Sequence, residues 1–411
     1  MLKTIFKNSS YLLISQLFVK IFAFGYAIFL AGNIGPADFG TYSAALSIFG
    51  LMSLFSDLGI NRVLTRDIAR DESELPKLFS TAMLLRAFSA AVSFLVLTIF
   101  FYLTDPSDLR FQLTTIALLS LIPQSIALSI DAILIAIKKV SYSALGFFLF
   151  NMVSIIIGSL LIFLDFGVFG AIIAFLTGQI FYGIFLVYLL MTSKKINFKP
   201  FDLHLAKTLL LKSWPYGILS AIGFASFRID TVILSFVRGG AETGNYALAY
   251  RFFDTATIIP VAFGTVLYPI FSEQIKNHEN VKKLFKQSLI TGFVAGIAVV
   301  ALINLAIPLF LSWFLNRFLP DGFEAASQTL SILSLALPFV FMHIPMGQLL
   351  LSREALLRKT ILLYLFVFIV NLILMLTIIP HHGSTGAAWI TVTVEALTFI
   401  SFFIFIRKKI L

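Results

Sequence analysis

The fold of this 411-residue chain is decided by the stretch Gly35-Pro36-Ala37-Asp38-Phe39-Gly40-Thr41-Tyr42, because part of it recurs further along the sequence. Its acid-x-Gly-x-Tyr pattern returns 204 residues later as Glu242-Thr243-Gly244-Asn245-Tyr246, and Gly239 takes the position of Gly35. Each copy lies just ahead of the second apolar segment in a set of six. Because an even number of segments separates the copies, we expect the two sets to run in the same direction.

The composition around this repeat is that of a membrane protein. Hydrophobic residues make up 59% of the chain and charged residues 12%, with a mean hydropathy of +0.99, whereas about a quarter of the residues of a soluble domain are charged. The sequence contains no cysteine, which excludes disulfides and cysteine catalysis. Apolar runs of membrane length predict twelve spanning helices. They cover 9–31, 41–60, 79–102, 111–137, 144–164, 167–191, 209–236, 243–272, 287–312, 326–351, 360–380 and 384–406.

The cations in the connections alternate between the two sides of the membrane. With the N-terminus inside, 22 of them fall in inner connections and 3 in outer ones. The positive-inside rule therefore places both termini in the cytoplasm. The net charge of +10 is mainly a topology signal, and we expect no nucleic-acid partner. The three outer cations are Arg110, Arg238 and Arg317.

These patterns predict an all-α integral membrane protein with about twelve transmembrane helices in two parallel six-helix lobes around a central cavity. The polar and basic segment 192–208 predicts the linker between lobes. The N-terminal lobe would then be residues 1–198 (helices 1–6) and the C-terminal lobe residues 199–411 (helices 7–12). Two charged segments with apolar residues at helical spacing, 61–78 and 273–289, predict interfacial helices.

Several sequence motifs resemble those of the Wzx-type polysaccharide flippases. These flippases belong to the superfamily that also contains the lipid II flippases and the multidrug and toxin extruders. The motifs are Gly35 to Tyr42, Phe55-Ser56-Asp57-Leu58-Gly59-Ile60-Asn61, Arg228-Ile229-Asp230 and Gly244-Asn245-Tyr246-Ala247-Leu248-Ala249-Tyr250-Arg251. The resemblance implies movement of an undecaprenyl-diphosphate-linked oligosaccharide from the inner to the outer leaflet of the bacterial plasma (inner) membrane. Transport would proceed by alternating access, for a surface polysaccharide such as O-antigen.

The same resemblance implies a transporter that is not an enzyme and carries no cofactor. Its partners would be the lipid-diphosphate-linked oligosaccharide and membrane lipids. The resemblance leaves open a coupling proton or sodium ion, and a polymerase or other glycan-assembly proteins as partners.

Cations inside the predicted spans are candidate substrate ligands. A charge at the bilayer centre costs about 2.5–3.5 kcal/mol, so such groups are expected to face water or one another. Arginine gives a phosphate two parallel hydrogen bonds and therefore suits a lipid diphosphate. We predict that Lys20, Arg228 and Arg251 bind substrate in the central cavity, with structural ion pairs as the open alternative. The aromatic candidates for stacking on sugar rings are Tyr26, Tyr246 and Tyr250.

Arg86 is a further substrate-binding candidate, although a structural pair with Asp57 or Asp131 at the same depth is the favoured alternative. The remaining intramembrane acids could bind a proton or sodium ion, or could be structural. The sequence does not choose among them, and the membrane potential could also act directly on the substrate. These ion-coupling or structural acids are Asp57, Asp230, Asp254 and Glu395.

The sequence predicts neither a metal site nor a nucleotide site. His204, His278 and His343 are isolated, and the adjacent His381 and His382 alone are a weak pair of ligands. No P-loop, Rossmann glycine pattern or Gly-x-Ser-x-Gly motif occurs.

Three other functions stay open. One is a cation-coupled multidrug extruder of the same superfamily. Another is a membrane-embedded glycan polymerase or ligase, which would need a larger outer loop than the sequence offers. A third is a sugar permease with twelve helices, although the segment Asn61 to Leu78 lacks the basic loop pattern expected of one.

Overall fold

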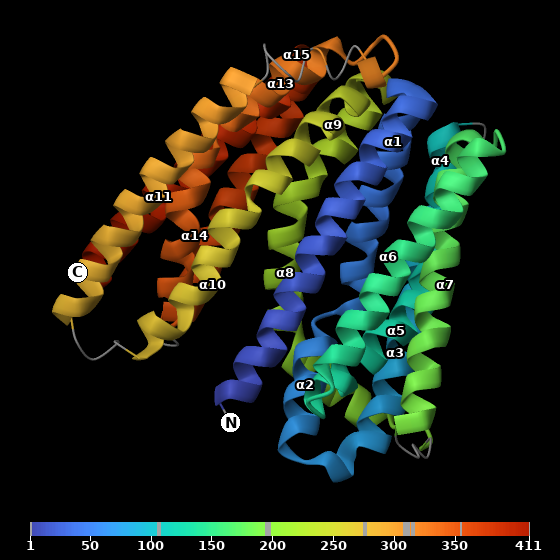
Figure 1. Ribbon diagram of the computed structural model, residues 1–411. Coiled ribbons are helices and arrows are strands. Elements are labelled where there is room, and N and C mark those ends of the chain that lie inside the picture. Colours follow the sequence, from blue (N-terminus) through green and yellow to red (C-terminus); the bar gives the residue numbers. More distant parts are fainter. Residues whose placement is uncertain are drawn as a thin grey trace. The chain divides into compact units, whose positions relative to one another are not determined.

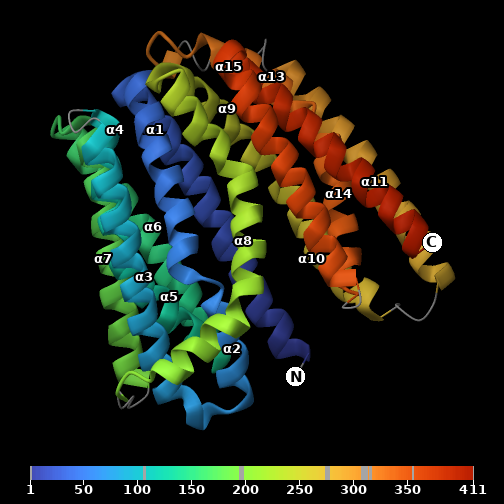
Figure 2. The same ribbon diagram turned by 180° about the vertical axis from the view of Figure 1, so that it is seen from behind.

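The computed structural model describes residues 2–104, 108–193, 199–273, 278–306, 313, 317–353 and 356–410, and in these ranges helix is the only regular secondary structure. Figures 1 and 2 show the helices from two sides. Lys194, Lys195 and Lys276, counted above as inner cations, lie outside the described residues. The helices are α1 (Leu2–Asp57), α2 (Ile60–Arg70), η1 (Glu72–Glu74), α3 (Leu75–Thr104), α4 (Leu109–Leu119), α5 (Leu121–Ala136), α6 (Val140–Phe163), α7 (Gly167–Ser193), α8 (Leu203–Val237), α9 (Gly240–Ala256), α10 (Ile258–Glu273), α11 (His278–Ala306), α13 (Glu324–Ser334), α14 (Leu337–Leu351) and α15 (Leu357–Lys409).

The predicted spans are recovered within the described residues. Nine helical stretches there are long and apolar enough to cross a membrane, and the pair α13 and α14, bent by 48°, makes a tenth. Two of the ten are interrupted, α1 at Gly35 and α15 at Gly383. As one straight helix the 56 residues of α1 would extend about 84 Å, far beyond a hydrocarbon core of about 30 Å. The two halves of α1 instead run side by side (Figures 1 and 2), and counting α1 and α15 as two spans each gives the twelve expected.

The outer connection expected between the first two spans is a single-residue break. Gly35 has φ 76° and ψ 173°, and Pro36 follows it as the first residue of the second half of α1. Proline is tolerated there because the first N–H groups of a helix have no partner within the helix. Gly239, its counterpart in the repeat, has φ 84° and ψ −176° and precedes α9. The two copies of the repeat therefore share the same backbone conformation at this position. Its positive φ lies in a region of backbone angles that favours glycine.

The glycines of the two repeat copies pack backbone against backbone. A Cβ on Gly40 would lie 1.9 Å from the carbonyl oxygen of Gly240, and a Cβ on Gly244 would lie 2.0 Å from the carbonyl oxygen of Pro36. No side chain fits at either place without movement of the backbone. The recurring glycine of the acid-x-Gly-x-Tyr pattern thus allows the two copies to touch.

The chain divides into two compact units. Unit 1 comprises Met1–Ile34 and Thr41–Arg228, and unit 2 comprises Gly35–Gly40 and Ile229–Leu411. This division differs from the lobes expected from the sequence, because most of α8 belongs to unit 1 and the short segment Gly35–Gly40 belongs to unit 2. The lobe boundary between residues 198 and 199 stays a prediction.

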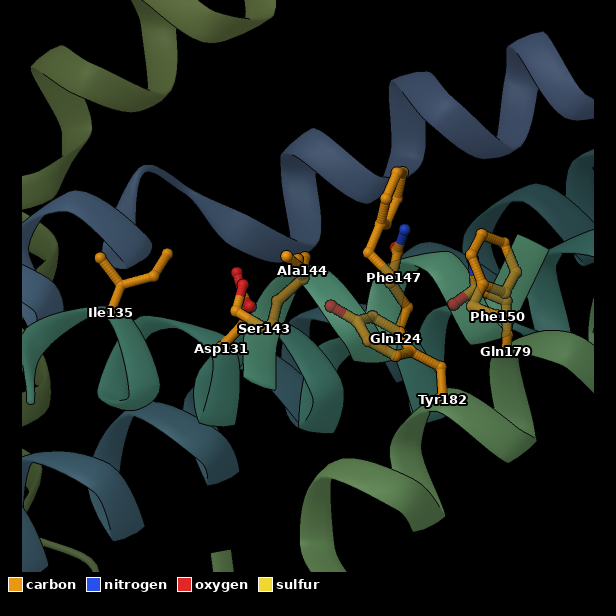
Figure 3. A pocket seen from close by; sticks show the side chains of 10 residues that line it. Gln124, Asp131, Ile135, Ser143, Ala144, Phe147, Phe150, Gln179 and Tyr182 are labelled. Atoms are coloured by element: carbon orange, nitrogen blue, oxygen red, sulfur yellow. The ribbon is translucent and has the colours of Figure 1, made fainter. Parts of the chain in front are cut away.

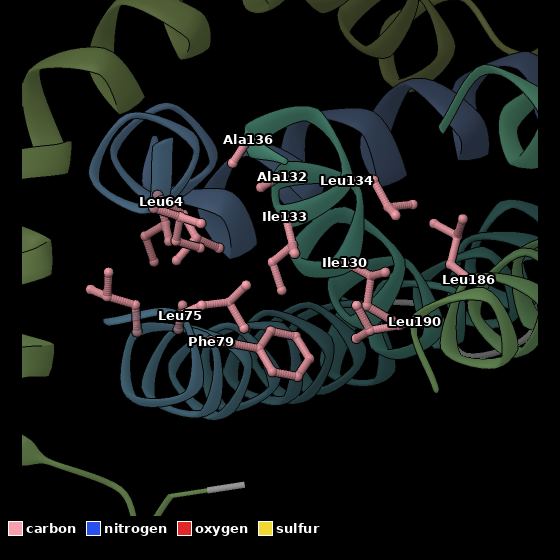
Figure 4. Packing of buried hydrophobic residues seen from close by; sticks show 14 of the residues in the cluster. Leu64, Leu75, Phe79, Ile130, Ala132, Ile133, Leu134, Ala136, Leu186 and Leu190 are labelled. Atoms are coloured by element: carbon pink, nitrogen blue, oxygen red, sulfur yellow. The ribbon is translucent and has the colours of Figure 1, made fainter. Parts of the chain in front are cut away.

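Each unit has its own apolar core. In unit 1 the apolar face of α2 packs against α3 and α5 (Figure 4), so this amphipathic helix, expected at the lipid interface, covers protein instead. In unit 2 the core joins the end of α10 and the start of α11 to the C-terminal parts of α14 and α15. Its members include Phe271, Phe285, Met346, Leu349 and Phe402.

An ionic cap holds the start of α8 within unit 1. The Leu205 backbone N–H donates to Asp202 Oδ1 at 2.9 Å, and Lys77 Nζ lies 3.0 Å from Asp202 Oδ2. These donors hold the pKa of the partly exposed Asp202 carboxyl below its ordinary value. A lowered pKa means that the cap is complete at neutral pH and is lost as the pH falls through that pKa.

We expect Gly40→Ala and Gly244→Ala to destabilise the protein by about 1–3 kcal/mol, because each added methyl group overlaps backbone atoms. The measurement is the melting temperature of the purified protein in detergent. Gly223→Ala is the matched control, since a Cβ on this α8 glycine would meet nothing within 4 Å. Equal melting temperatures for all three variants would contradict the packing role of the repeat.

Candidate functional site

A charged cluster is buried in unit 1 where α1, α3 and α5 meet. Arg86 on α3 has a fully buried side chain, which forms an ion pair with Asp57 at the end of α1. Its Nη1 also donates to Ser129 Oγ at 3.0 Å, and it interacts electrostatically with Asp131 on α5. The structure therefore gives Arg86 the ion pair that the sequence offered as the alternative to substrate binding. The three charged groups Arg86, Asp57 and Asp131 therefore lie close together in unit 1.

A cavity of about 380 Å³ opens beside this cluster, between α5, α6 and α7 of unit 1 (Figure 3). Asp131 Oδ1 and Gln179 Oε1 are buried and accept no hydrogen bond from any residue that the structure describes. Aromatic rings form the other part of the wall. The lining residues are Gln124, Leu128, Asp131, Ile135, Ser143, Ala144, Phe147, Phe150, Gln179 and Tyr182.

This cavity has the volume and lining of a small-molecule site. Pockets for such ligands measure about 300–1,000 Å³ and combine apolar walls with a few polar groups. Buried acceptors without donors are costly, so a ligand that donates hydrogen bonds would be favoured here. Sequence reasoning identified Asp131 as an intramembrane acid, but missed the cavity. Nothing in the sequence marked the uncharged Gln124 and Gln179 as its neighbours.

Asp230 accepts hydrogen bonds in unit 2 from groups on two helices, and a third helix contacts one of these groups. Only 1% of it is exposed on α8. The Tyr246 hydroxyl of α9 donates to its Oδ2, and the Thr231 backbone N–H donates to its Oδ1 at 2.6 Å. The same Tyr246 oxygen lies 3.4 Å from Thr391 Oγ1 of α15. Asp230 is thus part of a polar network that links α8, α9 and α15.

The tyrosines considered for sugar stacking lie inside their units. Tyr246 and Tyr250 are buried and pack on each other with ring centroids 5.6 Å apart. Tyr26 lies against α6, where a Cβ on Gly158 would overlap its hydroxyl. All three rings therefore already pack against protein.

Glu395 on α15 contacts His343 on α14. Nε2 of His343 lies 2.5 Å from Oε2 of Glu395, and each residue is only 8% exposed. His343, which has no other histidine near it in the sequence, therefore has an acidic neighbour in space. No sequence signal could have joined the two, because they belong to different helices.

The other predicted residues occupy less buried places. Lys20 is exposed on α1, and Arg228 is partly buried on α8 as the last residue of unit 1. Arg251 and Asp254 are partly buried on α9 in unit 2. Substrate binding by these residues stays a prediction. Among the described residues, no three His, Cys, Asp or Glu side chains gather in a way that could hold a metal ion.

These features define a multi-pass membrane protein with buried charges in both helical units, and its fold also occurs in known membrane transporters. The chain is similar to the lipid II flippase MurJ in an inward closed conformation, with a TM-score of 0.77, 19% identity, and 96% of this chain and 87% of that chain covered. It is also similar to an inward-facing multidrug resistance MATE family transporter of the MOP superfamily, with a TM-score of 0.78 and 17% identity over 95% of this chain and 94% of that chain.

A family described as polysaccharide biosynthesis protein matches residues 5–275, so the chain belongs to that family. A search of curated proteins finds no match. The family agrees with the polysaccharide branch that the sequence motifs resemble, and the Wzx type within it stays a proposal.

We expect Arg86→Met to destabilise the protein by about 3–5 kcal/mol, because it leaves the partly buried Asp57 carboxylate without its cation. Arg66→Met is the matched control. Its ion pair with Asp67 is partly exposed, so its loss should cost under about 1 kcal/mol. Both are measured as melting temperatures in detergent. If the two variants lower the melting temperature by similar amounts, the Arg86 ion pair contributes no more to stability than an exposed pair does.

Proposed function

We propose that this protein is a flippase of the Wzx type, which moves a lipid-diphosphate-linked oligosaccharide from the inner to the outer leaflet of the bacterial plasma membrane. The observation that carries the proposal is the polysaccharide biosynthesis family match over residues 5–275, in a chain whose fold also occurs in a lipid II flippase. Alternating access would expose the substrate to each side in turn. The product would serve the synthesis of a surface polysaccharide such as O-antigen, with both termini of the flippase in the cytoplasm.

The chemistry of such a substrate fits the side chains of the chain. A lipid diphosphate carries at least two negative charges, and its sugars are too polar for hydrocarbon. Lys20, Arg228 and Arg251 would replace water around the diphosphate, with arginine giving paired hydrogen bonds. In unit 1, the unpartnered oxygens of Asp131 and Gln179 would accept hydrogen bonds from sugar hydroxyls.

A second candidate function, a cation-coupled multidrug extruder, is favoured by one observation. The cavity of unit 1 combines the Asp131 carboxylate with the rings of Phe147, Phe150 and Tyr182, which suits an organic cation. The structural similarity to MATE transporters is compatible with this function. The polysaccharide family favours the flippase.

Deletion of the gene in its host separates the two functions. A flippase requires lipid-linked oligosaccharide to accumulate in the inner leaflet and surface glycan to disappear. An extruder requires normal glycan and increased sensitivity to cationic drugs. Accumulation of single units that have already reached the outer leaflet would instead point to a polymerase.

We expect Lys20→Ala, Arg228→Ala and Arg251→Ala each to reduce surface glycan export at least about tenfold, equal to about 1.4 kcal/mol of lost substrate stabilisation. Amounts of inserted protein, measured by immunoblotting of membranes, should stay the same. Arg228→Lys and Arg251→Lys should retain part of the activity, because they keep the charge and lose the paired donors.

Lys282→Ala is the matched control, since this exposed cation at the start of α11 belongs to the topology signal. It should export normally. Normal export by all three alanine variants would reject the assignment of these cations to the substrate.

A further inference from the structure

We propose that unit 1 binds one anionic phospholipid of the membrane in a groove between α3 and the start of α8. The groove consists of two open cavities of about 680 and 880 Å³. Phe201, Leu203 and His204 line both cavities, so the two adjoin each other. The first cavity contains most of the charged groups, and the walls of the second are mainly apolar. A molecule with a charged head and hydrocarbon chains therefore fits the groove as a whole.

Lysines give the groove an excess of positive charge. Lys77 and Lys199 line the charged cavity together with Asp202, and Lys207 lines the apolar cavity. Lys77 already pairs with Asp202, with Nζ 3.0 Å from Oδ2. Lys199 and Lys207 are exposed, and neither forms an ion pair with a residue that the structure describes. Their two ammonium groups can therefore bind the phosphate of a lipid headgroup.

The backbone of the charged end is fixed before any ligand binds. The Lys199 N–H donates to the hydroxyl oxygen of Ser80, a buried residue of α3, at 3.0 Å. The Asp202 carboxylate accepts from the Leu205 N–H at the start of α8 and pairs with Lys77 of α3. These contacts hold the chain ahead of α8 against α3. A preformed site of this kind pays less of the ordering cost that accompanies binding.

The apolar end of the groove continues into an exposed hydrophobic stripe on α3. The stripe begins at Phe88, which lines the apolar cavity, and includes Val92, Val96 and Ile99. Steps of three or four residues place these side chains on one face of the helix. From Phe88 to Ile99 the helix rises about 17 Å, close to half of a hydrocarbon core of about 30 Å. The stripe is thus long enough to contact an acyl chain within one leaflet.

The charged groups favour an ordinary phospholipid over a lipid diphosphate. Among the described residues, no arginine lines either cavity. Arginine gives the paired donors that suit a diphosphate, whereas lysine is a point charge. The groove also lies at the first turns of α3, the end predicted to be cytoplasmic, where anionic headgroups attract lysines. A glycerophospholipid with one negative charge, such as phosphatidylglycerol, is the occupant that this chemistry favours.

The first experiment measures lipid binding to the purified full-length protein by native mass spectrometry. The delipidated protein is titrated with phosphatidylglycerol, and with phosphatidylcholine of the same chains as the zwitterionic comparison. The wild type should bind its first phosphatidylglycerol at least about tenfold more tightly, because two lysines face the phosphate. The double variant Lys199→Gln, Lys207→Gln should lose most of this preference. Equal affinities in the wild type, or an unchanged preference in the double variant, would overturn the proposal.

Matched variants separate this groove from general effects of charge and surface. The double variant Lys282→Gln, Lys283→Gln removes two exposed cations of α11 and should keep the wild-type preference. Phe88→Ala should weaken the binding of both lipids, whereas Phe366→Ala, at an exposed position of α15, should not. All of these side chains are exposed, so the melting temperatures should stay close to that of the wild type. A preference that falls equally in both lysine double variants would contradict a defined site.

The second experiment locates the lipid in nanodiscs that contain phosphatidylglycerol with a photoactivatable acyl chain. Crosslinked peptides, identified by mass spectrometry, should come chiefly from α3 between Phe88 and Ile99. Their yield should fall at least about fivefold in the Lys199→Gln, Lys207→Gln variant. Crosslinks spread evenly over the exposed faces of other helices would refute the site. Displacement of the label by an equal concentration of polyprenyl diphosphate would assign the groove to the transported lipid and reject the phospholipid.

Discussion

The contact on which the arrangement of this chain depends is between backbones that carry no side chain. Gly40 meets Gly240 and Gly244, and Gly244 meets Pro36, at separations that leave no room for a Cβ. This contact assigns Gly35–Gly40 to unit 2, although the residues on either side of it belong to unit 1. The polypeptide therefore enters unit 2 for six residues and returns. The recurring glycine of the repeat lacks a side chain, and this allows the backbones of the two copies to come into contact.

The sequence predicted the features that follow from local chemistry. Apolar runs gave the spans because a bilayer requires a minimum length, and the repeat aligned Gly35 with Gly239, whose backbone angles are nearly the same. Contacts between distant residues were not accessible in this way. His343 and Glu395 are paired by the packing of α14 on α15, and the cavity at Asp131 requires uncharged residues from α5, α6 and α7. Helical spacing carries no information on which helix faces which.

Both units contain charged side chains within apolar helices. In each unit, nearby groups of the same unit stabilise these charges. Isolated charges in hydrocarbon would cost several kcal/mol each. In unit 1, Asp57 lies beside Arg86, and in unit 2, Asp230 accepts hydrogen bonds from Tyr246 and from the backbone of Thr231. These contacts permit the acids to occur within apolar helices. Among the predicted acids, therefore, burial by itself does not distinguish a structural role from ion coupling.

The chemical nature of the partner does distinguish them. The guanidinium group of Arg86 keeps its charge at any physiological pH, so its pair with Asp57 stays ionised and serves as a fixed element of unit 1. Glu395 contacts the imidazole of His343 instead, a group that carries no permanent charge. Helix α14, which carries His343, follows a bend of 48° after α13 and contains Pro345, whereas Arg86 lies within α3, which contains no such bend. The buried acids of the two units therefore differ in the kind of partner that each one contacts.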